Sequence, residues 1–170
     1  MRRVVTGHTQ DGKATVASDT EVDPILPSLG INLLWGADEA PIFPDGGSQL
    51  PHSTYFPPVG GFRFGVFTVE PQSSVQSTNQ QMMEIFEEAS QTFPDILRYG
   101  EKDHPGMHTT NTIDFEYVIS GEVWLELDDG EEVHLRAGDT VVQNGTRHAW
   151  RNKGSEPCSM VVCMIGARRM

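Results

Sequence analysis

The sequence has few cysteines and lacks any long hydrophobic run. Only two cysteines occur in 170 residues, Cys158 and Cys163, and their spacing fits neither a zinc knuckle nor a redox-active CxxC motif. The longest apolar run near the C-terminus, 160–165, is far too short to cross a membrane. The positively charged start is not followed by the apolar stretch of a secretory signal. We therefore expect two reduced thiols, a cytoplasmic location and no membrane segment.

Positive charge is also scarce. Lys and Arg number 12 against 24 Asp and Glu, which gives a formal net charge of -12. Such a field repels phosphate backbones and anionic lipid headgroups. We therefore expect no nucleic-acid partner and no membrane partner. The acidic residues are scattered along the chain rather than gathered in one block, so the charge is interpreted as an aid to solubility.

What the sequence does contain is a series of short β-like runs separated by turn residues. Its length suits one well-packed structural domain. Four β-like runs precede the middle of the chain: Arg3–Thr6, Ala14–Ala17, Ile31–Trp35 and Phe62–Val69. Between the last two, the Pro-rich segment 37–61 predicts a long ordered arm. We expect residues 1–76 to form N-terminal strands and an arm that pack on the barrel or on a partner subunit.

The period of the apolar residues changes in the middle of the chain. Met82, Ile85, Phe86 and Ala89 recur at the spacing of one helix face, which predicts a helical segment over 77–100. Such a helix either covers a pocket as a lid or packs its apolar stripe on the outside of the domain.

The remainder, 101–170, is predicted to be the barrel core. Ile113 to Ser120 alternates apolar and polar residues, and further short strands follow at regular spacing. Ser120-Gly121 predicts a turn, and Asp129-Gly130 is a strong hairpin signal. Short strands with glycine turns are typical of an all-β barrel or jelly roll, here with an N-terminal β extension and one or two short helices.

The first strand of this region carries polar residues at one parity. His108, Thr110 and Asp114 are all even-numbered, so an unbroken strand points them to one face and its large apolar residues to the other. Burying these groups costs several kcal/mol unless they meet a metal, one another or water. His148 adds a second imidazole from a separate strand, after a turn that contains Gly145.

These segments resemble the two signature motifs of the cupin superfamily. His108 stands at the position of the first motif's first His, and Asp114, seven residues before Gly121, stands at the position of its Glu. His148 and Asn152 match the end of the second motif. The resemblance covers the last part of the chain and implies a cupin-type jelly-roll barrel.

The chain departs from the family pattern at two places. Thr110 occupies the position of the first motif's second His, and the second motif is one residue short, with Asn144 where Pro is usual. The resemblance then implies a reduced metal site of His108, Asp114 and His148, with one divalent metal per chain. Two imidazoles and a carboxylate favour Fe(II), while Zn, Mn or Ni also fit.

The function implied is a metal-dependent enzyme that acts on a small oxygenated or aromatic organic molecule. Iron would favour dioxygenase chemistry, whereas zinc or manganese would favour isomerase, dehydratase or decarboxylase chemistry. The alternative is a non-catalytic cupin that binds a small molecule. The loss of a histidine at Thr110 favours this alternative, and the two retained imidazoles with a carboxylate favour the enzyme.

Neighbouring residues receive roles from their parity and position. Glu116 shares the parity of Asp114 and is interpreted as a general base, a further ligand or an outward-facing acid. Thr110 stands where the family has a histidine ligand, so we expect a substrate oxygen to bind the metal at this position. Gln143 is predicted to donate hydrogen bonds within the pocket, and Trp150 to form either a pocket wall or ordinary core.

The apolar face of the 113–119 strand also needs a cover. Either the N-terminal strands lie over it or a second subunit does. Many cupins form dimers, and the resemblance therefore implies a homodimer.

Overall fold

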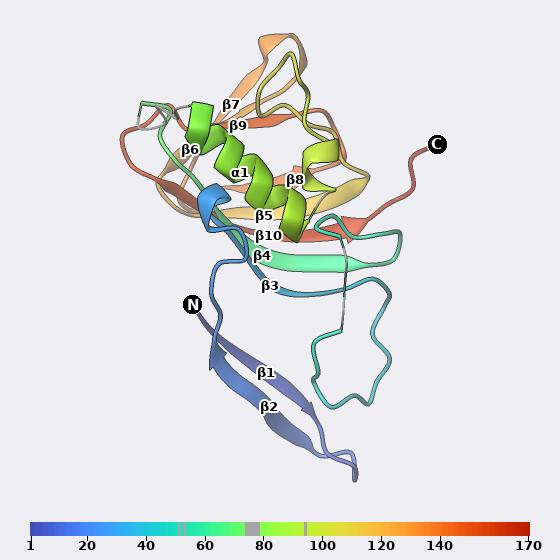
Figure 1. Ribbon diagram of the computed structural model, residues 1–170. Helices are drawn as coiled ribbons and strands as arrows, with labels where there is room; N and C mark the ends of the chain where they lie inside the picture. Colours follow the sequence, from blue (N-terminus) through green and yellow to red (C-terminus); the bar gives the residue numbers. More distant parts are fainter. Residues whose placement is uncertain (51, 53, 74–78, 94) are drawn as a thin grey trace.

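The computed structural model describes residues 1–50, 52, 54–73, 79–93 and 95–170, and most of its regular elements are strands (Figure 1). The strands are β1 (Arg2–His8), β2 (Ala14–Glu21), β3 (Ile31–Ala37), β4 (Phe62–Val69), β5 (Thr112–Ser120), β6 (Glu122–Glu126), β7 (Glu132–Arg136), β8 (Thr140–Gln143), β9 (Ala149–Arg151) and β10 (Cys158–Gly166). The helices are α1 (Asn79–Thr92) and three short 3₁₀ turns, η1 (Pro27–Leu29), η2 (Ile96–Arg98) and η3 (Asp128–Gly130).

The strands form two sheets of a jelly roll and one separate hairpin. The larger sheet has the order β3-β4-β10-β5-β8, the smaller has the order β7-β6-β9, and β1 pairs only with β2. All named pairs are antiparallel. The predicted all-β fold with an N-terminal β extension and short helices is confirmed. The strands β3 and β4, which the sequence analysis grouped with the extension, are hydrogen-bonded members of the larger sheet.

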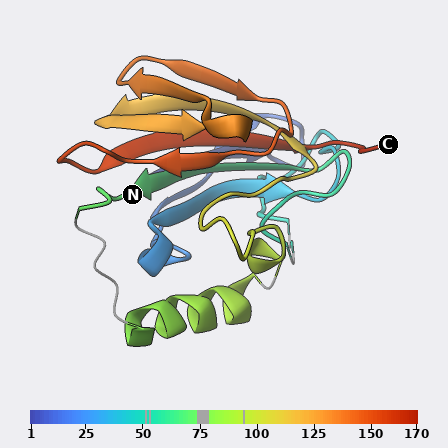
Figure 2. The ribbon, with the colours of Figure 1, turned by 90° about the horizontal axis from the view of Figure 1, so that it is seen from above.

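The core lies on one face of the larger sheet. One apolar cluster joins this face to the smaller sheet, through residues such as Val118, Met160 and Val123. A second cluster joins it to α1 and the 3₁₀ turns, through Leu33 and Phe93. Figure 2 shows α1 on the β3 side of the molecule, away from β6 and β7. The inner face of the larger sheet is therefore covered partly by strands and partly by the helix.

Helix α1 packs with a slightly different stripe from the predicted one. Ala89 is fully buried and Phe93, one turn later, is nearly so, whereas Phe86 is 52% exposed. Phe86 follows the half-buried Ile85 and points about 100° further around the helix. The expectation that Phe86 packs inward is therefore wrong. Residues 77 and 78 and the side chain of Met82 lie outside the part of the chain that the structure describes.

The turns that the sequence predicts between the barrel strands are present in the structure. Asp129 (φ 56°) and Gly130 (φ 77°) both adopt left-handed conformations between β6 and β7. Gly121 (φ 77°) makes the turn between β5 and β6, where a Cβ would stand 2.5 Å from the carbonyl oxygen of Pro157. A side chain at this glycine is therefore opposed both by the backbone angle and by a close neighbour.

Candidate functional site

The centre of the candidate site is a pair of histidines from the two motif segments. The N–H of His108 donates to the carbonyl of His148 at 2.9 Å, and the N–H of His148 donates back at 3.0 Å. This isolated antiparallel bridge brings the two ring centroids to 4.2 Å. Residues 40 positions apart are thus placed side by side by the backbone itself.

Both imidazole rings have a defined proton position. Nδ1 of His108 lies 3.0 Å from the carbonyl oxygen of Gly106, and Nδ1 of His148 lies 3.0 Å from that of Thr146. A carbonyl oxygen only accepts, so each Nδ1 carries the hydrogen and donates it. The lone pair is then left on Nε2 of each ring, which is the arrangement of metal-binding histidines.

Burial keeps these imidazoles neutral. It lowers the pKa of His108, and it lowers the pKa of His148 to about 4, with the neighbouring His108 adding to the second shift. Both rings are therefore uncharged near neutral pH. A neutral imidazole is the form that binds a metal ion.

Two carboxyl groups lie on the buried face of β5. Asp114 and Glu116 are 5% and 6% exposed, and the odd-numbered neighbours Phe115 and Tyr117 point outward. The predicted alternation is therefore confirmed within β5, but the strand begins at Thr112, so the expectation of one unbroken strand from His108 through Thr110 to Asp114 is wrong. Asp114 Oδ1 and Glu116 Oε2 are buried and have no hydrogen-bond partner in the described part of the chain. Unsatisfied groups of this kind cost about 1–3 kcal/mol each, so these two oxygens are sites where water, an ion or a ligand would be stabilised.

The same burial raises the pKa of both carboxyl groups. It raises the pKa of Asp114 to about 6, against a hydrogen bond from Thr112 that favours the charged form. It raises the pKa of Glu116 to about 8, and the negative charge of Asp114 adds to this shift. Glu116 is thus protonated at neutral pH and is able to donate a proton.

Gln143 lies opposite Asp114, because the two residues are paired in the register of β5 and β8. Its Oε1 accepts a hydrogen bond from the Thr146 hydroxyl, which fixes the orientation of the amide. Its Nε2 is left buried and without a partner among the described residues. Thr146 therefore links this amide to His148, whose ring donates to the carbonyl of Thr146.

The other two predicted site residues lie next to these groups. Thr110 is 1% exposed, and its hydroxyl shares a 2.8 Å hydrogen bond with that of Thr112. Trp150 packs edge-on against His148, with ring centroids 5.9 Å apart, and also contacts Phe67 at 6.2 Å. Trp150 thus serves both as a neighbour of the imidazole pair and as part of the core.

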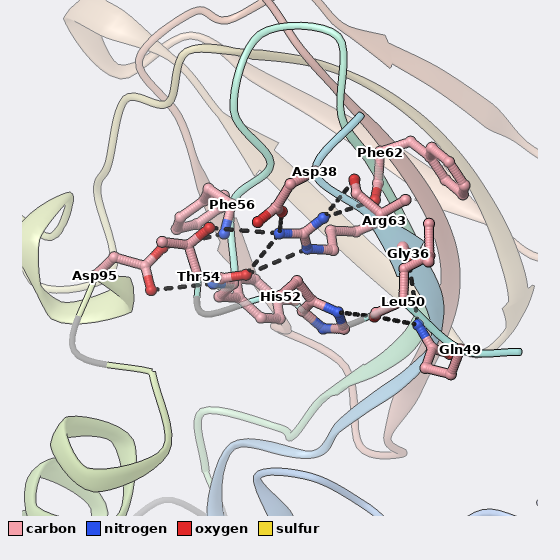
Figure 3. Close-up of polar contacts among 12 residues, drawn as sticks. Gly36, Asp38, Gln49, Leu50, His52, Thr54, Phe56, Phe62, Arg63 and Asp95 are labelled. Atoms are coloured by element: carbon pink, nitrogen blue, oxygen red, sulfur yellow. Dashed lines mark hydrogen bonds and ion pairs between the residues drawn. The ribbon is translucent and has the colours of Figure 1, made fainter. Parts of the chain in front are cut away.

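Three residues that the sequence analysis did not single out, Asp38, Arg63 and Asp95, make polar contacts with the arm (Figure 3). Arg63 is fully buried and donates to the carbonyls of Ala37 and Thr54, with an ion pair to Asp38 at 2.5 Å. The carboxylate of Asp95 accepts from the backbone N–H groups of Tyr55 and Phe56.

The arm thereby places Tyr55 within electrostatic range of Asp114 and Glu116. Burial and these carboxyl groups raise the pKa of its phenol. No periodic pattern in the sequence marks this residue, since its neighbours belong to a Pro-rich segment. An arginine within the apolar run Phe62–Val69, directly after the Pro-rich segment, is the sequence signal that could have drawn attention to it.

The imidazole pair fits two ligands of a divalent metal, because both rings are neutral and each carries its lone pair on Nε2. The carboxyl groups do not join it in a larger cluster. Within residues 1–50, 52, 54–73, 79–93 and 95–170, no group of three or more His, Cys, Asp or Glu is arranged to hold a metal ion. Asp114 is one methylene shorter than the Glu of the family motif, so it reaches less far from β5.

The fold and this pair of motif segments define a cupin barrel. Residues 96–164 match the family model described as a cupin domain. This segment is therefore a cupin domain, as the resemblance of its motifs predicted.

Curated relatives match parts of the chain. The phomopsin biosynthesis cluster protein D of Diaporthe leptostromiformis is 36% identical over 104 residues, which are 55% of each protein. The oryzines biosynthesis cluster protein J of Aspergillus oryzae is 46% identical over 61 residues, 34% of each. A cupin-domain-containing oxidoreductase of Hypocrea virens is 44% identical over 65 residues, 36% of this chain and 34% of the relative. The chain spans about half the length of these relatives, or less.

Solved structures give a more distant likeness. A cupin 2 conserved barrel domain protein from Salinispora arenicola is 20% identical with a TM-score of 0.40, covering 69% of this chain and 71% of that one. Separately, no helix among the described residues is long and apolar enough to cross a membrane.

Proposed function

We propose that this chain is a metal-dependent cupin enzyme that acts on a small oxygenated or aromatic organic molecule. The observation that carries the proposal is the imidazole pair of His108 and His148, whose protons are held on Nδ1 and whose Nε2 atoms are free. These two residues would hold one divalent metal, and Asp114, which forms no metal-binding group with them among the described residues, would have to move toward the pair to act as a third ligand. When bound, the metal would polarise a substrate oxygen and, as iron, supply redox chemistry.

The chain's own residues would bind and protonate the substrate. Gln143 Nε2 offers a hydrogen bond to a substrate oxygen, because Thr146 fixes the opposite end of the amide. Glu116, protonated at neutral pH, would donate or hold a proton at Oε2. Trp150 would limit the space beside the imidazole pair and keep water from it.

Among the reaction classes, oxidation is the first to test. Several curated relatives carry the name cupin-domain-containing oxidoreductase, and three others are named for biosynthesis clusters. These names favour redox chemistry on a small biosynthetic intermediate over isomerisation or decarboxylation. Fold by itself does not choose among them.

The proposal is tested by metal content. We expect the purified chain, reconstituted anaerobically with iron, manganese or zinc, to retain close to one metal ion per chain, and His148→Ala and His108→Ala to retain far less. His134→Ala is the matched control, because this exposed ring stacks on Trp124 at 4.0 Å in the smaller sheet. A wild-type protein without metal after reconstitution would contradict the proposal.

A non-catalytic, small-molecule-binding cupin is the second candidate. The observation that favours it is the Thr110 hydroxyl, which is engaged with Thr112 and leaves the position of a family ligand without a metal donor. This candidate predicts that small molecules released from the purified protein are identified by mass spectrometry while the metal content is low. A metal-loaded protein that converts a substrate excludes it.

A further inference from the structure

Two buried charged side chains hold one short part of the arm against the rest of the protein (Figure 3). Arg63 is fully buried, and its Nε and Nη2 both donate to the carbonyl of Thr54, at 3.2 and 2.9 Å. Asp95 is 9% exposed, and its two carboxylate oxygens accept from the N–H groups of Tyr55 and Phe56, at 3.0 and 3.1 Å. Burying a charge is costly unless it is bonded, and these bonds hold the backbone of Tyr55 in one place.

The side chain that this backbone presents is buried as well. Tyr55 is 8% exposed and belongs to the apolar cluster that contains Val162 and Met164 of β10. In the register of β10 and β5, Val162 is paired with Glu116 and Met164 with Asp114. The ring of Tyr55 is therefore packed over the strand next to the two site carboxyl groups, on the inner face of the larger sheet.

The direction of the ring follows from the charges that act on it. Asp114 and Glu116 both raise the pKa of the Tyr55 phenol more than Asp95 does, although Asp95 is bonded to the backbone of Tyr55 itself. Interactions between charges weaken with distance. The hydroxyl therefore points toward β5 and away from Asp95.

No bond within the protein accounts for this hydroxyl. It forms no hydrogen bond with the described part of the chain, whereas the backbone N–H of the same residue does. Unlike Asp114 Oδ1 and Glu116 Oε2, it is not wholly enclosed, so water or a ligand can reach it. Phenylalanine would pack against the same apolar neighbours without the cost of removing an O–H group from bulk water. The hydroxyl is thus available to a ligand bound in the site.

We propose that Tyr55 contacts the substrate of the enzyme proposed above and donates a hydrogen bond to a substrate oxygen, an assignment that rests on that proposed function. Gln143 provides a second donor, because its Nε2 is buried and has no partner among the described residues. An O–H and an N–H that lack partners in the protein are both satisfied by an acceptor oxygen.

The position of the carboxyl groups favours a neutral acceptor. The sheet order is β10-β5-β8, so Asp114 and Glu116 on β5 stand between Tyr55, packed over β10, and Gln143 on β8. A carboxylate placed between the two donors would meet like charge, whereas a ketone, ester or amide carbonyl accepts from them without adding charge. The substrate class that fits is a small neutral carbonyl compound.

Thermal unfolding of Tyr55→Phe in the metal-free protein tests whether the hydroxyl is unbonded. The variant should match or exceed the wild-type midpoint, whereas loss of a structural hydrogen bond would lower the midpoint by about 2–4 °C in a chain of this size. Tyr117→Phe is the matched control, because this ring lies on the outer face of β5 and is 44% exposed. A midpoint that falls in Tyr55→Phe alone would overturn the assignment.

Probe binding to the metal-free protein tests the contact itself. The chain has 3 tyrosines, so protein labelled with 3-fluorotyrosine gives a fluorine NMR signal for each, and Tyr55→Phe identifies the signal of Tyr55. Acetophenone should shift this signal, and calorimetry should show that it binds Tyr55→Phe about fivefold more weakly, the loss of one neutral hydrogen bond. Ethylbenzene, which lacks the carbonyl, should bind the wild type and Tyr55→Phe equally.

The remaining outcomes separate this contact from the metal. Acetophenone that binds neither protein, binds both equally, or shifts only the signals of Tyr99 and Tyr117 would overturn the contact. Benzoate that binds the wild type more tightly than acetophenone would overturn the substrate class. Binding that depends on Tyr55 in a protein that retains no metal after reconstitution would uphold the contact and reject the metal-dependent enzyme, while metal retention with equal probe binding would do the reverse.

Discussion

The peptide groups of His108 and His148 hydrogen-bond to each other in both directions, at 2.9 and 3.0 Å. The backbone therefore sets the 4.2 Å separation of their rings, and no side-chain network is needed to bring them together. Each ring is then oriented by a carbonyl two residues earlier in its own segment. Removal of one ring should leave the other in place, so that single histidine variants report on metal binding rather than on folding.

Asp114→Asn tests whether this carboxylate is the third metal ligand. The amide keeps the size of the side chain and removes its charge. As a ligand, Asp114 would supply the negative charge of the set, so we expect metal affinity to fall at least tenfold, measured by competition with a chromophoric chelator. Asp139→Asn, a substitution of an exposed carboxylate at the β7–β8 turn, is the control and should have no effect. Equal affinities for wild type and Asp114→Asn would limit the site to the imidazole pair.

Thr110→His tests the vacated ligand position. A third imidazole there should raise metal affinity and, by occupying the position that a substrate oxygen would take, lower turnover of any identified substrate. Thr110 is fully buried, so the larger ring also costs roughly 1–3 kcal/mol of stability. Thr110→Ala, measured beside it, removes only the hydrogen bond to Thr112. If the histidine variant binds metal no more tightly than the alanine variant, Thr110 does not face the metal.

Glu116→Gln should change how stability depends on pH in the metal-free protein. Burial raises the pKa of Glu116 from 4.5 to about 8, so between these values the folded state holds a proton that the unfolded state has released. The free energy of unfolding of the wild type therefore falls as pH rises through this window. Glutamine cannot ionise, so the variant should match the wild type near pH 4 and exceed it by roughly 2–4 kcal/mol above pH 8.

Urea denaturation at several pH values measures this difference. The subtraction removes the parallel contribution of Asp114, which is present in both proteins. Glu39→Gln, at an exposed position, is the control and should show no pH-dependent gain. A constant difference between Glu116→Gln and the wild type from pH 4 to 9 would contradict the assignment of a buried, protonated Glu116.

Gly121→Ala and Gly130→Ala separate backbone strain from steric contact. Both glycines have φ of +77°, but a Cβ at Gly121 would lie 2.5 Å from the Pro157 carbonyl oxygen, whereas nothing lies within 4 Å of one at Gly130. We expect Gly130→Ala to cost about 1–2 kcal/mol, the price of the left-handed conformation. Gly121→Ala should cost at least twice as much, as measured by chemical denaturation. Equal losses would mean that the β5–β6 turn moves freely away from Pro157.

The sequence by itself determined the features that depend on local pattern. Alternation over residues 113–120 decided which side chains of β5 are buried, because successive side chains of a strand point to opposite faces. Asp129-Gly130 decided the β6–β7 turn, because these two residues tolerate positive φ. His108 and His148 could be chosen in advance because the sequence resembles the two family motifs at these positions.

The tertiary structure decided what depends on contacts between distant segments. Strand β4 joins the larger sheet by pairing with β10, almost a hundred residues away, and β3 joins it by pairing with β4; the local pattern carries no register for either pairing. The exposure of Phe86 was decided by how α1 rotates against the core. The backbone N–H of Tyr55 donates to Asp95, which lies 40 residues further along the chain. Such features depend on which distant segments come together in space. The periodicity of a sequence indicates only which side of one strand or helix each side chain faces.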